Sequence, residues 1–197
     1  GMGEPLANYE NVMRSVKILN HPQGKGLGIR HITISTCGLA DKIRQLSGEK
    51  LVPRLAISLN TADDGVRSKL MPVNKKYDLK SLKSAVKQYQ VKTGRRITFE
   101  YVLIKDVNDS GQDVKKLLRF IEGLKCNVNL IGLNSHPGCK YRPSGNRVIA
   151  AFAEALSQAG VETVVRKKLG GDIFAACGQL GAKIKNCSNI DRNRPEQ

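Results

Sequence analysis

The sequence predicts an α/β protein in which a parallel β-sheet is built from repeated strand–helix units. Short runs rich in β-branched residues alternate with segments whose apolar residues recur at helical spacing, which is typical of parallel sheets. The 197 residues are 40% hydrophobic, enough for one sizeable core, so we expect a single domain. The predicted strands are, in chain order, His31–Ser35, Arg54–Leu59, Ile97–Ile104, Asn127–Leu133 and Val161–Val165.

Helices are predicted before, between and after these strands. Asn8–Leu19 has the apolar spacing of a helix and precedes the first strand. Asp78 and Ser110 suit the N-caps of two further helices, because their side-chain oxygens accept hydrogen bonds from free backbone amides. Another helix should start near Ser144 and end at Gly160, where a left-handed residue favours glycine. It should turn four apolar residues toward the sheet: Val148, Ile149, Phe152 and Leu156.

The two ends of the chain look different from its middle. The chain opens in the loop before a helix, whereas β/α folds begin with central strands, so we expect at least one strand to be missing. Lys183–Gln197 is polar and predicts a disordered tail. The expected organisation is therefore a core over residues 1–182 and a tail over residues 183–197.

The charge balance indicates a polyanionic partner. Lysine and arginine number 33 against 17 acidic residues, giving a formal net charge of +16. Such a surface binds nucleic acid in a salt-dependent way, although a solvated basic surface without a specific partner remains open. No apolar stretch is long enough to cross a membrane, and no signal peptide is visible. We therefore expect a cytoplasmic protein.

The cysteines and histidines predict no metal site. The five cysteines include no C-x-x-C pair, and the three histidines are scattered through the sequence. Cys177 lies beside two alanines, a setting in which cysteine is usually a buried apolar residue. Local sequence alone therefore gives Cys177 no reactive role.

Short polar residues recur where the predicted strands end. Ser35 follows the first strand, Ser58, Leu59 and Asn60 end the second, and Asn134 follows the fourth. In parallel β/α folds this edge of the sheet carries the ligand site. Taken singly, each residue also suits a helix cap. Glu4 adds a carboxylate that suits an ammonium group, or simply an acidic first turn beside Pro5.

Several segments together resemble one family. They are Gly1–Pro5, Thr33–Thr36, Ala56–Leu59, Met71–Tyr77, Phe99–Leu103, Val107–Asp109, Asn129–Ile131 and Ala175–Leu180. In this order they resemble the radical S-adenosylmethionine (SAM) methyltransferases that act on C2 of adenine in 23S rRNA and in tRNA.

The resemblance implies a partial parallel β/α barrel of the radical SAM type, truncated at the N-terminus. It also implies a four-iron, four-sulfur (4Fe-4S) cluster and bound SAM. By matching motifs, Gly3 and Glu4 would hold the methionine end of SAM. Its remaining contacts would come from Ser35, Ser58, Leu59, Asn60 and Asn134. Cys177 matches the family's cysteine that accepts a methyl group before its transfer to adenine.

The sequence departs from the family in ways that bear on activity. The C-x-x-x-C-x-x-C motif that holds the cluster has no counterpart here, nor does the family's second cysteine. Asn60 stands where many members carry histidine, which removes a group that titrates near neutral pH. The resemblance therefore predicts a fragment unable to start the radical reaction.

The residues also leave two alternative functions open. One alternative is a non-catalytic RNA-binding module, favoured by the net charge. The other is a small-molecule enzyme that uses Glu4, Ser35, Ser58 and Asn134 without a cluster.

A further expectation concerns assembly. An unpaired first strand is an open pairing surface, which predicts self-association of the chain.

Overall fold

The computed structural model describes residues 3–134 and 139–166. Its centre is a five-stranded sheet in the order β1-β2-β3-β4-β5, and every neighbouring pair is parallel. The strands are β1 (Thr33–Thr36), β2 (Arg54–Ser58), β3 (Ile97–Leu103), β4 (Cys126–Gly132) and β5 (Thr163–Arg166). Sequential parallel order is the winding of a β/α barrel, whereas a doubly wound sheet reverses its strand order.

One helix, α1 (Tyr9–Asn20), precedes β1, and the other helices connect each strand to the next. They are α2 (Ala40–Leu46), α3 (Asp64–Leu70), α4 (Leu79–Thr93), α5 (Gly111–Ile121) and α6 (Asn146–Gln158). Short 3-10 turns occupy Pro5–Asn8, Ile29–His31 and Pro72–Lys75. No described helix is long and apolar enough to cross a membrane.

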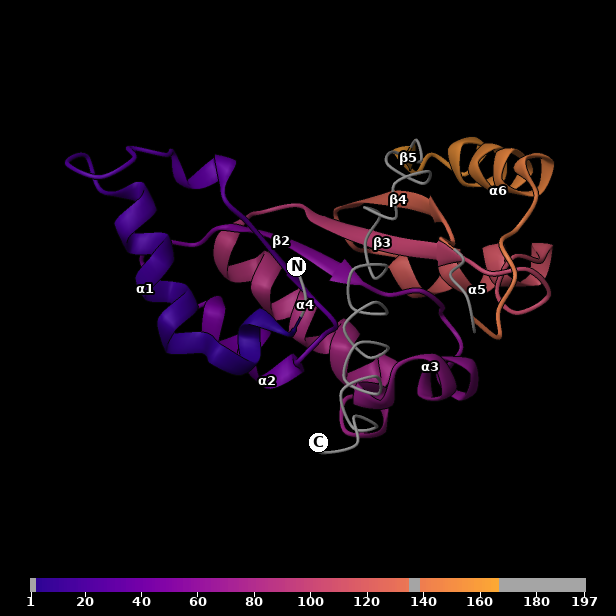
Figure 1. The fold of residues 1–197 in the computed structure, drawn as a ribbon, viewed down its shortest axis with the longest axis horizontal. Helices are drawn as coiled ribbons and strands as arrows, with labels where there is room; N and C mark the ends of the chain where they lie inside the picture. Colours follow the sequence, from indigo (N-terminus) through magenta and orange to yellow (C-terminus); the bar gives the residue numbers. More distant parts are fainter. Residues whose placement is uncertain (1–2, 135–138, 167–197) are drawn as a thin grey trace, which may run out of the picture.

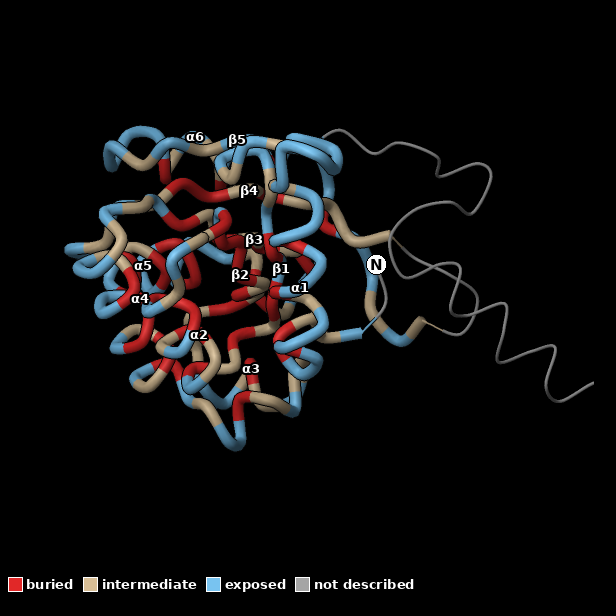
Figure 2. Tube along the Cα trace, turned by 90° about the vertical axis from the view of Figure 1, so that its left-hand side faces the viewer, coloured by how far each residue is buried: buried red, intermediate tan, exposed pale blue. Residues whose placement is uncertain are grey.

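The helices and the sheet share one hydrophobic core. Figure 1 shows α2 and α4 below β2 and β3, with α6 at the far end of the sheet. In Figure 2 the buried residues concentrate where the strands meet α4 and α5. Burial along β3 alternates strictly, since Ile97, Phe99, Tyr101 and Leu103 are fully buried and the residues between them are not. The other face of the sheet is therefore free for polar side chains.

The predicted strands and caps are confirmed, with boundaries shifted by up to two residues. Asp78 accepts a hydrogen bond from the Ser81 amide at 2.7 Å and begins α4. Ser110 and Asp113 cap each other's backbone amides and begin α5. Gly160 has φ +78°, as a left-handed residue after a helix should.

Two expectations about helices were wrong or incomplete. Val148, expected to face the sheet, is 39% exposed, because α6 begins at Asn146 and points Ile149, Phe152 and Leu156 inward instead. The short helices α2 and α3 were not predicted. The expected tail over residues 183–197 lies outside the described residues. β1 is an edge strand of the described sheet, so self-association through it remains a prediction.

Candidate cofactor site at the carboxyl edge of the sheet

The free face of the sheet carries a row of polar side chains near the carboxyl ends of the strands. Ser58, Glu100 and Asn129 are register partners on β2, β3 and β4. Glu100 is the centre of this row, with its side chain 19% exposed. Its carboxylate accepts hydrogen bonds from Ser35 Oγ on β1 and from Arg166 Nη1 on β5, each at 3.3 Å. One carboxylate thus links side chains of the two edge strands.

Glu4 is bound to the end of β1. Its Oε1 accepts from the Leu6 amide at 3.0 Å and from Thr36 Oγ1 at 2.7 Å, while its Oε2 accepts from the Cys37 amide at 2.7 Å. Pro5 occupies the first position of the 3-10 turn that Glu4 caps. The expected helical start at Pro5 is therefore confirmed, with Glu4 as its N-cap and not in its first turn, and the role of Glu4 toward an ammonium group remains a prediction.

Cys37 is half-buried beside the Glu4 carboxylate. Burial first, and then the neighbouring negative charge of Glu4, raise the pKa of the Cys37 thiol to about 12. Because only the thiolate reacts with alkylating agents, Cys37 should be almost inert at pH 8. We expect iodoacetamide to modify it roughly 100-fold more slowly in the folded chain than in urea, as read by peptide mass spectrometry. Equal rates would contradict this environment.

A buried arginine holds the ends of β1 and β2 together. Arg67 on α3 is fully buried. Its guanidinium donates to Cys37 O at 2.7 Å, to Leu59 O at 3.1 Å and to Asn74 Oδ1 at 2.8 Å. Gly38 has φ +102°, and a Cβ there would lie 3.3 Å from Arg67 Nη2, so this position needs glycine. Burial lowers the pKa of Arg67, but an arginine keeps its charge in proteins.

The buried side-chain amide of Asn108 joins the end of β2 to β3. Asn108 is fully buried and donates from Nδ2 to Asn60 O at 2.6 Å and to Val102 O at 2.8 Å. Its Oδ1 accepts from the Ile104 amide at 2.7 Å. Asn60 has φ +61°, and its own Oδ1 accepts from the Val102 amide at 3.1 Å. The Asn60 side chain therefore already serves the backbone of β3.

The remaining predicted residues lie at the same edge but differ in what they can offer. The Leu59 side chain is in the core, and its amide and carbonyl are bonded to Glu100 O and to Arg67. Gly3 has φ +105° with no atom within 4 Å of an added Cβ. Asn134 Oδ1 is buried and accepts no hydrogen bond from a described residue. An unpaired buried acceptor costs about 1–3 kcal/mol, which a ligand donor could recover.

Cys177 lies outside the described residues. Within residues 3–134 and 139–166, no group of three histidine, cysteine or acidic side chains could hold a metal ion.

A groove of about 470 Å³ lies near Leu118, Cys126 and Val161, at the start of β4 and just before β5. It is at the amino edge of the sheet and does not belong to the candidate site.

The sequence did not single out Arg67, Glu100 or Asn108. Asn108, Glu100 and the buried Asn74 lie in segments that carry the family resemblance, which was the only signal for them. Arg67 gave none, because an arginine in a short polar helix is normally exposed. Beyond its motif, Glu100 gave no signal, because a single acidic residue in a strand usually faces solvent.

Comparison with known proteins places the chain in a family. A model of the radical SAM superfamily matches residues 1–121. A curated relative from Thermotoga neapolitana, named "Probable dual-specificity RNA methyltransferase RlmN", is 48% identical over 185 residues, 94% of this chain and 54% of that protein. A relative of the same name from Thermoanaerobacter sp. (strain X514) is 46% identical over 183 residues, 93% of this chain and 54% of that protein. The chain thus spans about half the length of these relatives.

Solved structures agree with the sequence relatives. A radical SAM methyltransferase from Sphaerobacter thermophilus has a TM-score of 0.88 at 45% identity, over 91% of this chain and 52% of that one. A domain of pyruvate-formate lyase-activating enzyme from Bacteroides vulgatus has a TM-score of 0.62 at 18% identity, over 85% of this chain and 96% of that one. The second likeness shows the fold alone. The predicted partial β/α barrel of the radical SAM type is confirmed.

Proposed function

The chain belongs to the radical SAM superfamily, and we propose that its carboxyl sheet edge is the SAM-binding part of a methyltransferase acting on adenine C2 in 23S rRNA and tRNA. The observation that carries this proposal is Asn134 Oδ1, a buried acceptor left unpaired among the described residues at the edge where polar groups of several strands gather. SAM, when bound, supplies the methyl group. The relatives' printed name supports RNA as the substrate.

The described residues fit the polar groups of SAM. A carboxylate such as Glu4 suits its ammonium group, and the Ser58 hydroxyl suits its ribose or carboxylate oxygens. The Asn134 amide offers an acceptor and two donors to the adenine edge. Gly3 leaves the backbone open beside Glu4. Cys177 remains the proposed methyl acceptor by its motif.

Loss of the Asn134 side chain should weaken SAM binding. We expect Asn134→Ala to lower the affinity by about tenfold, because the buried amide would no longer pair with the cofactor. Equilibrium dialysis with labelled SAM measures this. The matched control is Asn146→Ala, at an exposed position of α6, which should leave the affinity unchanged. Equal affinities of wild type and Asn134→Ala would refute the assigned contact.

The cluster does not fit the described residues, because 4Fe-4S clusters are held by several cysteine thiolates and no three possible ligands lie together there. The printed sequence also lacks the C-x-x-x-C-x-x-C motif. We therefore propose that these 197 residues alone do not start the radical reaction. Anaerobic treatment with iron, sulfide and reductant, followed by analysis of 23S rRNA and tRNA for methyladenosine, tests this. Methylated adenine would overturn the proposal.

A chimera tests the methyltransferase assignment itself. This chain can replace the segment of the Thermotoga neapolitana relative that it matches. The chimera should methylate adenine in RNA, and the same chimera carrying Cys177→Ala should not. Failure of the intact chimera, although folded and loaded with cluster, would count against the assignment.

The net charge of +16 favours a second candidate, a non-catalytic RNA-binding module. Both candidates place the chain in the cytoplasm, with RNA. They differ in the chimera, because a module without chemistry would bind RNA and leave it unmethylated. Filter binding to rRNA fragments across salt concentrations measures the shared property.

A further inference from the structure

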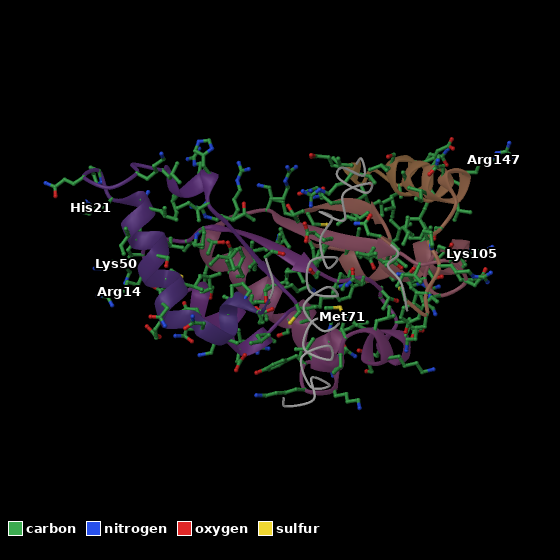
Figure 3. The ribbon with its side chains drawn as sticks, viewed as in Figure 1. Arg14, His21, Lys50, Met71, Lys105 and Arg147 are labelled. Atoms are coloured by element: carbon green, nitrogen blue, oxygen red, sulfur yellow. The ribbon has the colours of Figure 1, made fainter. Side chains whose placement is uncertain are left out.

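Two loops at the carboxyl edge of the sheet carry exposed basic side chains that the cofactor site does not use. One loop leaves β3 and contains Lys105. The other follows β4 and contains Lys140 and Arg142, and Arg147 lies in the first turn of α6, into which this loop leads. We call these four residues the basic rim. Figure 3 shows Lys105 and Arg147 at the same end of the molecule, beside the loop and helix that follow β3 and β4.

The two loops are fixed against each other by backbone contacts. Ile104 and Pro143 form an antiparallel bridge, and the Lys105 amide donates to Arg142 O at 2.9 Å. Ser144 Oγ donates to Asp109 Oδ2 at 2.7 Å and closes the same junction. The rim therefore presents its charges from a rigid base, so less conformational entropy is lost when a partner binds.

Little negative charge opposes the rim. The Asp109 carboxylate accepts hydrogen bonds from Ser144 Oγ and from the Asp106 amide. Asp106 faces Arg142 at 3.5 Å, but both side chains are at least 70% exposed, and such pairs are weak. The segment from Cys139 to Arg147 contains no acidic residue at all. The four cations of the rim outnumber the two neighbouring carboxylates of Asp106 and Asp109, so the net charge of this surface is positive.

The rim also lies next to the proposed reaction site. Its two loops leave the carboxyl ends of β3 and β4, and Asn134 is the second residue after β4. An RNA whose adenine reaches the site from this edge must bring its neighbouring phosphates over these loops. Lysine and arginine contacts to phosphate fix the position of a nucleic acid without reading its sequence.

We propose that the basic rim is the docking surface for the RNA phosphates that flank the target adenine, an inference that rests on the proposed function. The partner chemistry is a run of phosphodiesters, and the contacts are charge-assisted hydrogen bonds. Lys105 and Arg147 are the best probes, because no ion pair among the described residues involves them and both are exposed.

The test compares two double charge reversals of the full chain. Lys105→Glu with Arg147→Glu alters the rim. Lys87→Glu with Lys92→Glu, on exposed positions of α4 toward the amino edge, changes the net charge equally. Filter binding to a 23S rRNA fragment should show about a tenfold loss for the rim variant and a salt slope smaller by about 1–2. The α4 variant should stay close to wild type.

Each outcome decides a different point. If the two variants lose RNA affinity equally, the rim is no special surface, and the inference fails while the proposed function stands. If wild type binds no RNA at low salt, the RNA substrate fails as well. Polyglutamate of equal charge, added as a competitor, separates phosphate from acidic protein as the partner. If it leaves the binding of RNA to the rim intact, phosphate is the preferred partner. If it competes as well as RNA does, the assignment is overturned. SAM dialysis on both variants confirms that the cofactor site is unaltered.

Discussion

Replacement of Arg67 by methionine is expected to lower the free energy of unfolding by about 3–5 kcal/mol. Methionine fills a similar volume but donates no hydrogen bond. Three acceptors in the buried surroundings of this guanidinium, Cys37 O, Leu59 O and Asn74 Oδ1, then lose their donor. Three such losses of about 1–3 kcal/mol each sum to about 3–9 kcal/mol, and the expected value lies in the lower half of this range, comparable to the whole stability of a marginal domain.

Urea titration followed by circular dichroism measures this effect. Arg67→Lys is informative beside it, because lysine keeps the charge but cannot reach three separate acceptors from one planar group. It should fall between wild type and Arg67→Met. Arg30→Met, at an exposed position, serves as the control and should change stability by less than about 0.5 kcal/mol. A comparably small loss of stability in Arg67→Met would mean that the hydrogen bonds of Arg67 do not hold the strand ends together.

Asn108→Asp should be nearly as harmful, for a reason that depends on pH. The change keeps the shape of the side chain but removes the two donor hydrogens that reach Asn60 O and Val102 O. An ionised carboxylate at this fully buried position would face two carbonyl oxygens. We expect a loss of about 3 kcal/mol at pH 7.

The sign of the pH dependence makes the prediction specific. Burial and the two carbonyls raise the pKa of the introduced carboxyl in the folded state above its unfolded value of about 3.9. The variant therefore regains stability relative to wild type as pH falls toward that value, and loses it as pH rises through the folded pKa. Urea midpoints of both proteins between pH 4 and 8 measure the difference. The exposed control Asn146→Asp should show no such trend, and a constant difference in Asn108→Asp would contradict the geometry.

Local signals made most of the architecture predictable. Each strand is a short run that contains β-branched residues, and the caps Asp78 and Ser110 act within three residues of their own position. The helix α3 was missed because its one buried side chain is Arg67, which no apolar pattern reports. Val148 was misplaced because the exact start of α6 decides which apolar residues point inward.

The sequence by itself determined the order of the strand–helix units, the family and the edge of the sheet at which we propose the site. These follow from periodicity and from motifs read along the chain. Only the tertiary structure decided how the polar groups at that edge are used. Glu4 and Asn60 are held by partners more than 30 residues away, whereas Asn134 Oδ1 stays unpaired among the described residues. Such pairings depend on which strand ends meet in space, because a side chain forms its hydrogen bonds with spatial neighbours whatever their separation in sequence.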